Sequence, residues 1–569
     1  MSFKTFVTAF LILIAHAAVP AAQTATGTIS GVTLLNTRTQ DDVNGLDNLG
    51  IRSQLLFTPT GSVAITVTGD QTRQRPEGFT QVVAGVAPTL RAANRQYEQI
   101  AASIGYVAPS FNAFDRVTDI DTPMRSYQDL GGASVNADWT IGRGRLTSTT
   151  AWRFWDWKPS NDRDFIGVPV TSISAAPSYQ EQWTQEVRYS GVVSPRFNFV
   201  TGAFYFRQAL DSDPSFKQEQ GSAAFGQAEW TVSRRLRLLP GLRFNYDQKD
   251  VVFDQQVYGG LQTTDAALIA LQRSILAPQS YTADVDDTNL SGQMTAAYRV
   301  TRAVNAYATY ATGFKSIGLN LNGVPTDAAD QPVLSAATVK PEDVRHVEIG
   351  LKTEPLPGVT ANVTVYNTAI KDFQAQVVNA GVGVLRGYLA NAEKVRVRGA
   401  EFDGSARVNN RLSFYGNAAY TDGRYMSFPD APPPLEETGG PQFKDVSGSM
   451  LPGISKWAVS VGGEYIVPGN ILARPGEFFG ALDTSYRSSF SSSASASRYL
   501  IVDGHSLVNA RVGFRWTDGW TLSVWSRNLL NRDYLELLSA APGNTGLYVG
   551  QPGDPRTVGV TMRVTLKSS

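Results

Sequence analysis

The sequence has no cysteine among its 569 residues and only three histidines. The absence of cysteine excludes disulfides, thiol nucleophiles and cysteine metal sites. His16, His346 and His505 are too scattered along the chain for a histidine metal site or a catalytic triad. Charged residues make up only 18%, which is low for a soluble chain of this size, and 50 basic residues balance 50 acidic ones. Without a basic excess, a nucleic-acid partner is not expected.

Long apolar runs are also absent. The longest is FVTAFLILIA (6–15), which follows Lys4 and precedes the small-residue stretch AAVPAAQTA. This run is too short to span a bilayer, and its flanks are typical of a secretory signal. We therefore predict a signal peptide over 1–22, with cleavage near Ala21 or Ala22. A mature chain that lacks transmembrane helices can be integral to a membrane only as a β-barrel.

Alternating apolar and polar residues are abundant, as in LVNARVGFRWTDGWTLSVWSRNLLNRDYL (507–535). Val512 and Phe514 share one face of an extended chain, while Arg511 and Arg515 share the other, so the pattern predicts a strand. The Thr-Asp-Gly stretch at 517–519 predicts a hairpin turn. The hairpin alone is compatible with a soluble β-sandwich, whose apolar face points inward, or with an outer-membrane barrel, whose apolar face meets lipid.

The spacing of the turns distinguishes these two folds. Short turns are expected at 58–61, 142–144, 194–195, 233–235, 301–303, 355–358, 467–470 and 517–519. Long connections lie between them, around 72–130, 158–182, 248–289, 315–343, 371–393, 424–453 and 529–554. Outer-membrane barrels pair short periplasmic turns with long extracellular loops. We therefore predict an all-β, antiparallel transmembrane barrel of about 20 strands, with loop helices over 90–104 and 266–276.

Several motifs resemble one known family. They are AFGQAEWTVSRRLRLLPGLRFNYDQK (224–249), NAYATYATGFKSIGLN (305–320), VKPEDVRHVEIGLKTE (339–354), NAEKVRVRGAEFDGSARVNNRLSFYGNAAYTDGRY (391–425), SRNLLNRDYL (526–535) and PGDPRTVGVTMRVTL (552–566). Together they resemble the barrel of TonB-dependent outer-membrane receptors. The resemblance implies a Gram-negative outer-membrane location, a barrel of 22 strands with an N-terminal plug domain, and energy-coupled uptake of scarce ligands such as ferric siderophores, cobalamin, haem or saccharides.

The sequence departs from the family pattern in three places. No plug is found between the signal and the first strand, which we expect over 28–38, so 23–569 is expected to be barrel alone. The first two family strands are also expected to be missing, and Leu566, followed by a three-residue tail, stands where the family ends in an aromatic residue. The TonB system is therefore expected as a partner only if a plug is supplied separately.

No catalytic constellation is found, and no cofactor or metal site is expected. Asp284, Asp286 and Asp287 lack the spacing of a calcium loop and are expected to be solvated loop charges. The candidates for an anionic ligand inside the lumen are the arginines Arg243, Arg299, Arg511 and Arg515. Pairing of these arginines with luminal carboxylates such as Glu229 and Glu348 is the favoured alternative.

Three functions remain open from the sequence. The first is uptake of a small molecule or metal chelate as a TonB-dependent receptor. The second is a passive, porin-like channel that is independent of TonB. The third, a secreted all-β enzyme or lectin, lacks the pocket of carboxylates or aromatics that it needs, so no enzyme is expected. Outer-membrane lipid is the expected surrounding, and a monomer is the expected state.

Overall fold

The computed structural model describes residues 45–77, 81–121, 124–162, 165, 167, 175–258, 264–266, 269, 277–327, 331–378 and 387–565. It also describes the backbone of 26–29 and 32–35. The predicted signal peptide 1–22, most of the helix expected over 266–276 and the C-terminal residues 566–569 lie outside the described residues.

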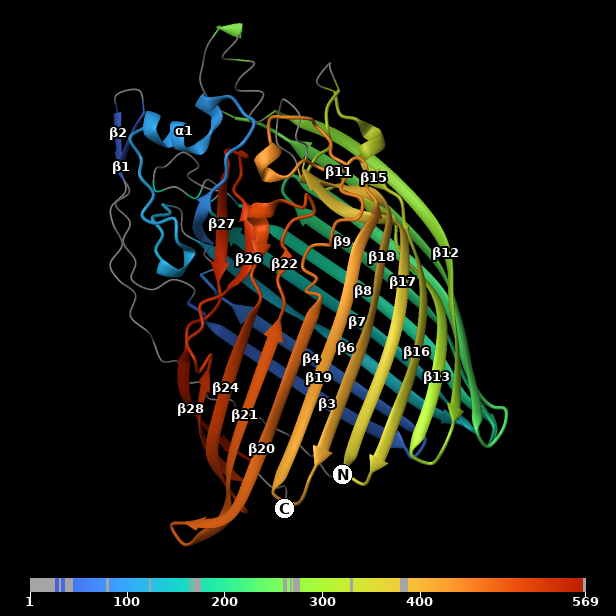
Figure 1. Ribbon diagram of the computed structural model, residues 1–569. Coiled ribbons are helices and arrows are strands. Elements are labelled where there is room, and N and C mark those ends of the chain that lie inside the picture. The colour runs from blue at the N-terminus through green and yellow to red at the C-terminus, as the bar shows by residue number, and fades with distance from the viewer. Residues whose placement is uncertain are drawn as a thin grey trace.

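Nineteen strands form the ring of the barrel wall (Figure 1). They are β3 (Asn48–Thr60), β4 (Val63–Gln74), β6 (Arg125–Ile141), β7 (Gly144–Ser160), β8 (Ser178–Ser194), β9 (Phe197–Ser212), β10 (Ser215–Thr231), β11 (Leu236–Gln255), β12 (Gln279–Arg299), β13 (Val304–Lys315), β16 (Glu342–Leu356), β17 (Val359–Val378), β18 (Gly387–Arg407), β19 (Leu412–Ser427), β20 (Trp457–Ile471), β21 (Arg474–Arg487), β24 (His505–Trp516), β25 (Trp520–Arg527) and β28 (Thr557–Val564). The prediction of an all-β barrel with about 20 strands is confirmed for the described residues.

The period of two in the sequence sets the two faces of the wall. On β11, Leu242 is 65% exposed and Phe244 lies on the same outward face. Arg243 and Asn245 alternate with them and face inward, where a water-filled lumen accepts polar groups. Apolar side chains left exposed on the outward face of many strands have the pattern that lipid requires.

One end of the barrel carries only short turns, at the bottom of Figure 1. The turns cover 61–62, 142–143, 195–196, 232–235, 300–303, 357–358, 408–411, 472–473 and 517–519. The opposite end carries the long connections, with one exception: β9 and β10 are joined by 213–214 alone. Several strands also extend further than the sequence suggested, since β11 continues to Gln255 and β12 begins at Gln279.

The long connections carry small elements of their own. A three-stranded sheet is formed by β5 (Val82–Val86), β26 (Leu535–Ala540) and β27 (Leu547–Pro552), and two-stranded sheets by β14 (Gly318–Leu319) with β15 (Thr338–Val339) and by β22 (Phe490–Ser491) with β23 (Ile501–Val502). The helices are α1 (Tyr97–Ser103), η1 (Ala93–Arg95), η2 (Ala113–Asp115), η3 (Leu334–Ala336), η4 (Leu435–Glu437) and η5 (Arg498–Leu500). η1 and α1 confirm part of the helix expected over 90–104. In the described part of the chain, no helix is long and apolar enough to cross a membrane.

Buried apolar side chains gather in four clusters at this outer end. One cluster holds Tyr97, Tyr106 and Val549, and joins α1 to the three-stranded sheet. Another holds Phe253, Tyr281 and Val324, at the outer ends of β11 and β12. The apolar core of the protein therefore packs the loops together, while the wall itself places its apolar side chains outward.

The strand expected over 28–38 is not part of the wall. β1 (Thr26–Ile29) pairs with β2 (Val32–Leu35) in a separate two-stranded sheet, with Ile29 opposite Val32. The two strands are therefore antiparallel to each other. The first strand of the wall is β3, which begins at Asn48.

The ring order places β28 beside β3, and we call this junction the seam. A residue register joins eighteen of the nineteen neighbouring pairs in the wall. Among the described residues, none joins β28 to β3. The seam therefore differs from every other junction in the wall.

Candidate functional site in the barrel lumen

The luminal face carries hydrogen-bonded polar side chains from neighbouring strands. Tyr307 on β13 donates a 2.6 Å hydrogen bond from its hydroxyl to Oε1 of Glu348 on β16. Nε2 of His346 lies 3.4 Å from Oε2 of the same carboxylate, and its Nδ1 lies 2.8 Å from the hydroxyl of Thr368 on β17. His346 thus belongs to a luminal network across three strands, which its isolated position in the sequence did not reveal.

Two of the four candidate arginines lie together. Arg515 on β24 contacts Glu464 on β20 at 2.7 Å and Glu477 on β21 at 3.1 Å. Arg511, four residues earlier, lies 3.5 Å from Glu464. The ring of Phe479 lies beneath both guanidinium groups, 4.1 Å from that of Arg515 and 5.3 Å from that of Arg511. Two cations facing two carboxylates leave little net charge here for an anionic ligand.

Of the four candidates, Arg511 and Arg515 pair with carboxylates, and their partners are not the two named from the sequence. Glu229 pairs with Arg237, its neighbour across the β10–β11 ladder, and Glu348 contacts His346. Arg511 and Arg515 lie on β24, near β20 and β21 in the ring order, so only carboxylates on those strands are within reach.

Arg243 lies in a different environment, on the other side of the ring. Its Nε donates a 2.8 Å hydrogen bond to Oδ1 of Asn245, and its guanidinium lies 5.6 Å from the ring of Phe225 and 5.8 Å from that of Phe204. Within the described residues, no carboxylate lies at ion-pair distance from it. Arg243 therefore presents a positive charge to the lumen from an aromatic bed, which an anionic or aromatic ligand can contact.

Arg299 is separated from the other candidates. It ends β12 at the rim with the short turns, where it lines a cavity of about 270 Å³ with Arg302, Lys352 and Glu354. The four arginines predicted from the sequence therefore do not form one site. Arg511 and Arg515 form an ion-pair cluster, Arg243 faces the lumen alone, and Arg299 belongs to the rim.

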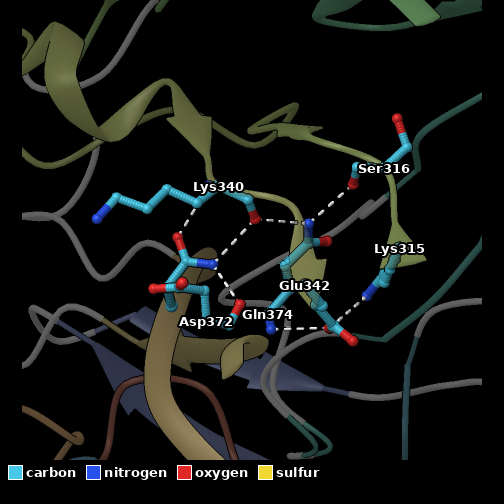
Figure 2. Close-up of polar contacts among 7 residues, drawn as sticks. Lys315, Ser316, Lys340, Glu342, Asp372 and Gln374 are labelled. Carbon is cyan, nitrogen blue, oxygen red and sulfur yellow. Dashed lines mark hydrogen bonds and ion pairs between the residues drawn. The ribbon is translucent and has the colours of Figure 1, made fainter. Parts of the chain in front are cut away.

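A buried polar cluster fixes the outer ends of β13, β16, β17 and β18 (Figure 2). Glu342 is 5% exposed; its Oε1 accepts a 2.8 Å hydrogen bond from the backbone N–H of Gln374 and lies 3.4 Å from Nζ of Lys315. The side chain of Gln374 donates to the carbonyls of Ser316 and Lys340 at 2.9 and 3.0 Å. These bonds hold β14 and β15 against the mouth, and no local sequence pattern had indicated them.

Another buried group lies between α1 and the three-stranded sheet. Tyr106 bonds both carboxylate oxygens of Asp119 at 3.0 and 2.9 Å. Burial is the main cause that raises the pKa of Asp119 to about 6, and the nearby carboxylates of Asp162 and Asp121 raise it further, although the bond from Tyr106 opposes the shift. We call the outer segment built from α1 and the three-stranded sheet the cap. The cap therefore contains a carboxyl group whose pKa folding raises to about 6.

The acidic triplet on β12 does not form a metal site. Asp286 and Asp287 are adjacent on one strand, so their side chains point to opposite faces of the wall. Over the described ranges, no group of three or more His, Cys, Asp or Glu residues is placed to hold a metal ion. The luminal groups described above can bind a ligand by hydrogen bonds, charge and aromatic contact.

Comparisons with known proteins agree with this architecture. The family model described as TonB dependent receptor-like, beta-barrel matches residues 64–529. No curated protein sequence matches the chain.

Solved structures give a close match in fold at low sequence identity. The ferric yersiniabactin uptake receptor FyuA from Yersinia pestis superposes with a TM-score of 0.68 at 16% identity, covering 97% of this chain and 80% of that chain. The closed form of the ferric-catecholate import receptor Fiu from E. coli K12 gives 0.66 at 14% identity, with 95% and 81% covered. The copper transporter OprC gives 0.63 at 14% identity, with 96% and 80% covered.

Proposed function

Because this chain belongs to the TonB-dependent receptor-like β-barrel family, we propose that it takes up a scarce small ligand, of the metal-chelate class, across the outer membrane of a Gram-negative cell. The family and its structural neighbours are transport receptors of the outer membrane, among them siderophore and metal receptors. The neighbours' ligands differ from one another, and what they have in common is a metal or its chelate.

The observation that carries this proposal is the contrast between Arg243 and the other luminal arginines. Arg511 and Arg515 are neutralised by Glu464 and Glu477. Arg243 has no such partner among the described residues and lies on the rings of Phe204 and Phe225. A cation over aromatic rings suits a flat, negatively charged chelate, which can contact both charge and ring.

The proposal can be tested by uptake of radiolabelled iron supplied as a ferric catecholate or as ferric citrate, at low concentration, in cells with and without TonB. We expect TonB-dependent accumulation of one chelate, provided that a plug is present on this chain or on a second polypeptide. Arg243→Gln should lower uptake about tenfold, as expected for loss of a charged hydrogen bond. Arg237→Gln, on the same strand and paired with Glu229, is the matched control and should retain uptake.

The alternative is a passive channel. It predicts equal flux with and without TonB, weak selectivity among chelates, and no special role for Arg243. Conductance in planar bilayers measures this directly. Induction of expression by iron limitation, compared with a change of carbon source, separates a metal-chelate ligand from a saccharide.

A further inference from the structure

Positive charge is concentrated in the short turns of the barrel. Six arginines stand in these turns: Arg143, Arg196, Arg234, Arg235, Arg302 and Arg411. The same turns contain only one carboxylate, that of Asp518. The chain as a whole has no net charge, so this rim is basic because charge is distributed unevenly along the molecule.

These arginines are not neutralised within the protein. All six are exposed, and none forms an ion pair with another described residue. Asp518 is already paired with Arg474, at the start of β21. The positive charge of the rim is therefore available to an anionic partner from outside the described residues.

The arginines are placed at a definite depth. Three of them follow an exposed aromatic residue by four positions: Arg143 follows Trp139, Arg234 follows Trp230, and Arg302 follows Tyr298. Trp230 and Tyr298 are the last outward-facing residues of β10 and β12, and Trp139 lies two residues before Ile141, which ends the outward face of β6. Aromatic girdles mark this edge of the hydrocarbon layer. At about 3.3 Å per strand residue, the guanidinium groups lie just beyond that edge, at the level of lipid headgroups.

The turns also follow one another around the barrel. The four that join β6 to β7, β8 to β9, β10 to β11 and β12 to β13 are consecutive, and each carries at least one arginine. Cavities open along this arc. One, of about 360 Å³, is lined by Arg143 and Arg145, and the cavity of about 270 Å³ is lined by Arg299, Arg302 and Lys352, with Glu354 as its one carboxylate.

We propose that this basic arc binds the phosphate groups of anionic phospholipids in the periplasmic leaflet of the outer membrane. Guanidinium groups match the oxygens of a phosphodiester in a bidentate geometry. A row of them at headgroup depth attracts anionic lipid in preference to neutral lipid. This inference concerns the outside of the barrel and is independent of the ligand that passes through it.

The test uses the full chain, folded into vesicles of phosphatidylcholine that contain a small fraction of spin-labelled phosphatidylglycerol or spin-labelled phosphatidylcholine. The wild type should select the anionic label, by about fivefold for each arginine in contact, and salt should weaken the selection. The variant R143Q/R234Q/R302Q should lose most of it. The control R95Q/K340Q/K394Q removes three exposed charges from the opposite end and should retain it.

Three results would overturn the proposal: equal selection by the wild type and the arc variant, equal loss in the control, or removal of the selection by millimolar inorganic phosphate, which would indicate a site for the free anion. Heat-modifiable gel mobility checks that each variant folds. If the glutamine variant does not fold, R143K/R234K/R302K keeps the charge and should retain a measurable part of the selection. Loss of all selection in this folded lysine variant would also contradict the assignment to charge.

Discussion

The strands at the seam alternate like those in the rest of the wall, but they differ in how they pair with their neighbours. β17 is paired on both sides, with a register that continues to Val378 opposite Gly387 on β18. β3 has a register with β4 alone, β28 has one with β25 alone, and every residue of β3 is exposed. The same alternating pattern therefore gives a continuous register in one place and a junction without one in another.

Strand direction explains the difference. β3 leads into the short turn 61–62, and β28 follows the long outer connection 528–556, so both strands run toward the periplasm. Neighbours with the same direction cannot continue an antiparallel ladder. A strand that runs outward between β28 and β3 would restore the antiparallel order. A second copy of this chain, inserted in the same orientation, could not supply such a strand, because its own β3 and β28 also run toward the periplasm. In lipid, each backbone group left unpaired costs several kcal/mol, so the seam should be the weakest junction of the wall.

The largest loss of stability is expected when a charge is placed on the lipid face of the wall. Leu242→Arg places a charge on the lipid face of β11 and should lower the free energy of unfolding by about 2–4 kcal/mol near the midplane. Gln293→Arg, opposite Gly241 on the luminal face, should be tolerated. Urea unfolding in vesicles measures both, and equal damage would show that the two faces are wrongly assigned.

Proline substitution compares the wall with the seam directly, because proline removes one backbone donor. In the wall, Ala296→Pro and Ala297→Pro lie on a strand paired on both sides, so each should lose about 1–3 kcal/mol of stability. At the seam, the N–H groups of Val560 and Thr561 point in opposite directions, one toward β25 and the other toward the seam. Proline at the residue whose N–H points toward the seam removes no hydrogen bond of the ladder, so that variant should keep near wild-type stability. Similar losses at all four positions would indicate a ladder across the seam.

Disulfide trapping tests the same comparison with a smaller effect on stability, and the absence of native cysteine makes it unambiguous. V512C/V524C joins register partners on β24 and β25 and should form a disulfide under mild oxidation. Leu55→Cys combined with cysteine at Val558, Val560 or Met562 should form none efficiently. Non-reducing gels provide the readout, and one dominant disulfide among the three seam pairs would contradict a junction without register.

The smallest expected effect is a pH dependence of stability that is confined to the cap and leaves the wall and the seam unchanged. Folding raises the pKa of Asp119 to about 6 from its ordinary value of 3.8, so the folded cap holds a proton that the unfolded chain releases. This stabilisation is present below pH 3.8, falls as the pH rises, and is lost above pH 6, with an upper limit of about 3 kcal/mol. Hydrogen exchange of α1, corrected for chemical rates, should be slower at pH 5 than at pH 7.

Asp119→Asn is the matched control for the cap. The amide cannot titrate, so the difference between pH 5 and pH 7 should disappear while the wall and the seam are unaffected. A pH dependence that survives this substitution would assign the effect to another group, with Asp162 and Asp121 as the nearest carboxylates.

Much of the barrel was predictable because its signals are local. A period of two is set within a few residues, so Leu242 and Arg243 could be assigned to opposite faces from the sequence. Most of the short turns were found for the same reason, but the turn at 408–411 was missed, and the turn expected at 467–470 lies within β20. The outer connection at 213–214 was missed because it is as short as a periplasmic turn, so the rule that outer loops are long did not apply to it.

The candidate site was predictable only in part. Alternation placed Arg511 and Arg515 in the lumen, but it carried no information about Glu464 and Glu477, which lie more than thirty residues away in the chain. The polar cluster around Glu342 depends on four strand ends meeting at the mouth. Such ion pairs and polar clusters depend on the register between strands that are distant in the sequence, so no short sequence motif predicts them.

Alternation, turn residues and the spacing of short turns and long connections were enough to predict a membrane barrel with a polar interior, because each can be read along the chain without knowledge of its partners. The tertiary structure alone decided which charges pair with each other, and that Arg243 lies against the rings of Phe204 and Phe225 with no carboxylate partner among the described residues. It also decided that Asp119 is buried and that β3 and β28 are neighbours without a register. These features depend on strand order, register and direction, which are set when segments far apart in the sequence pair with one another.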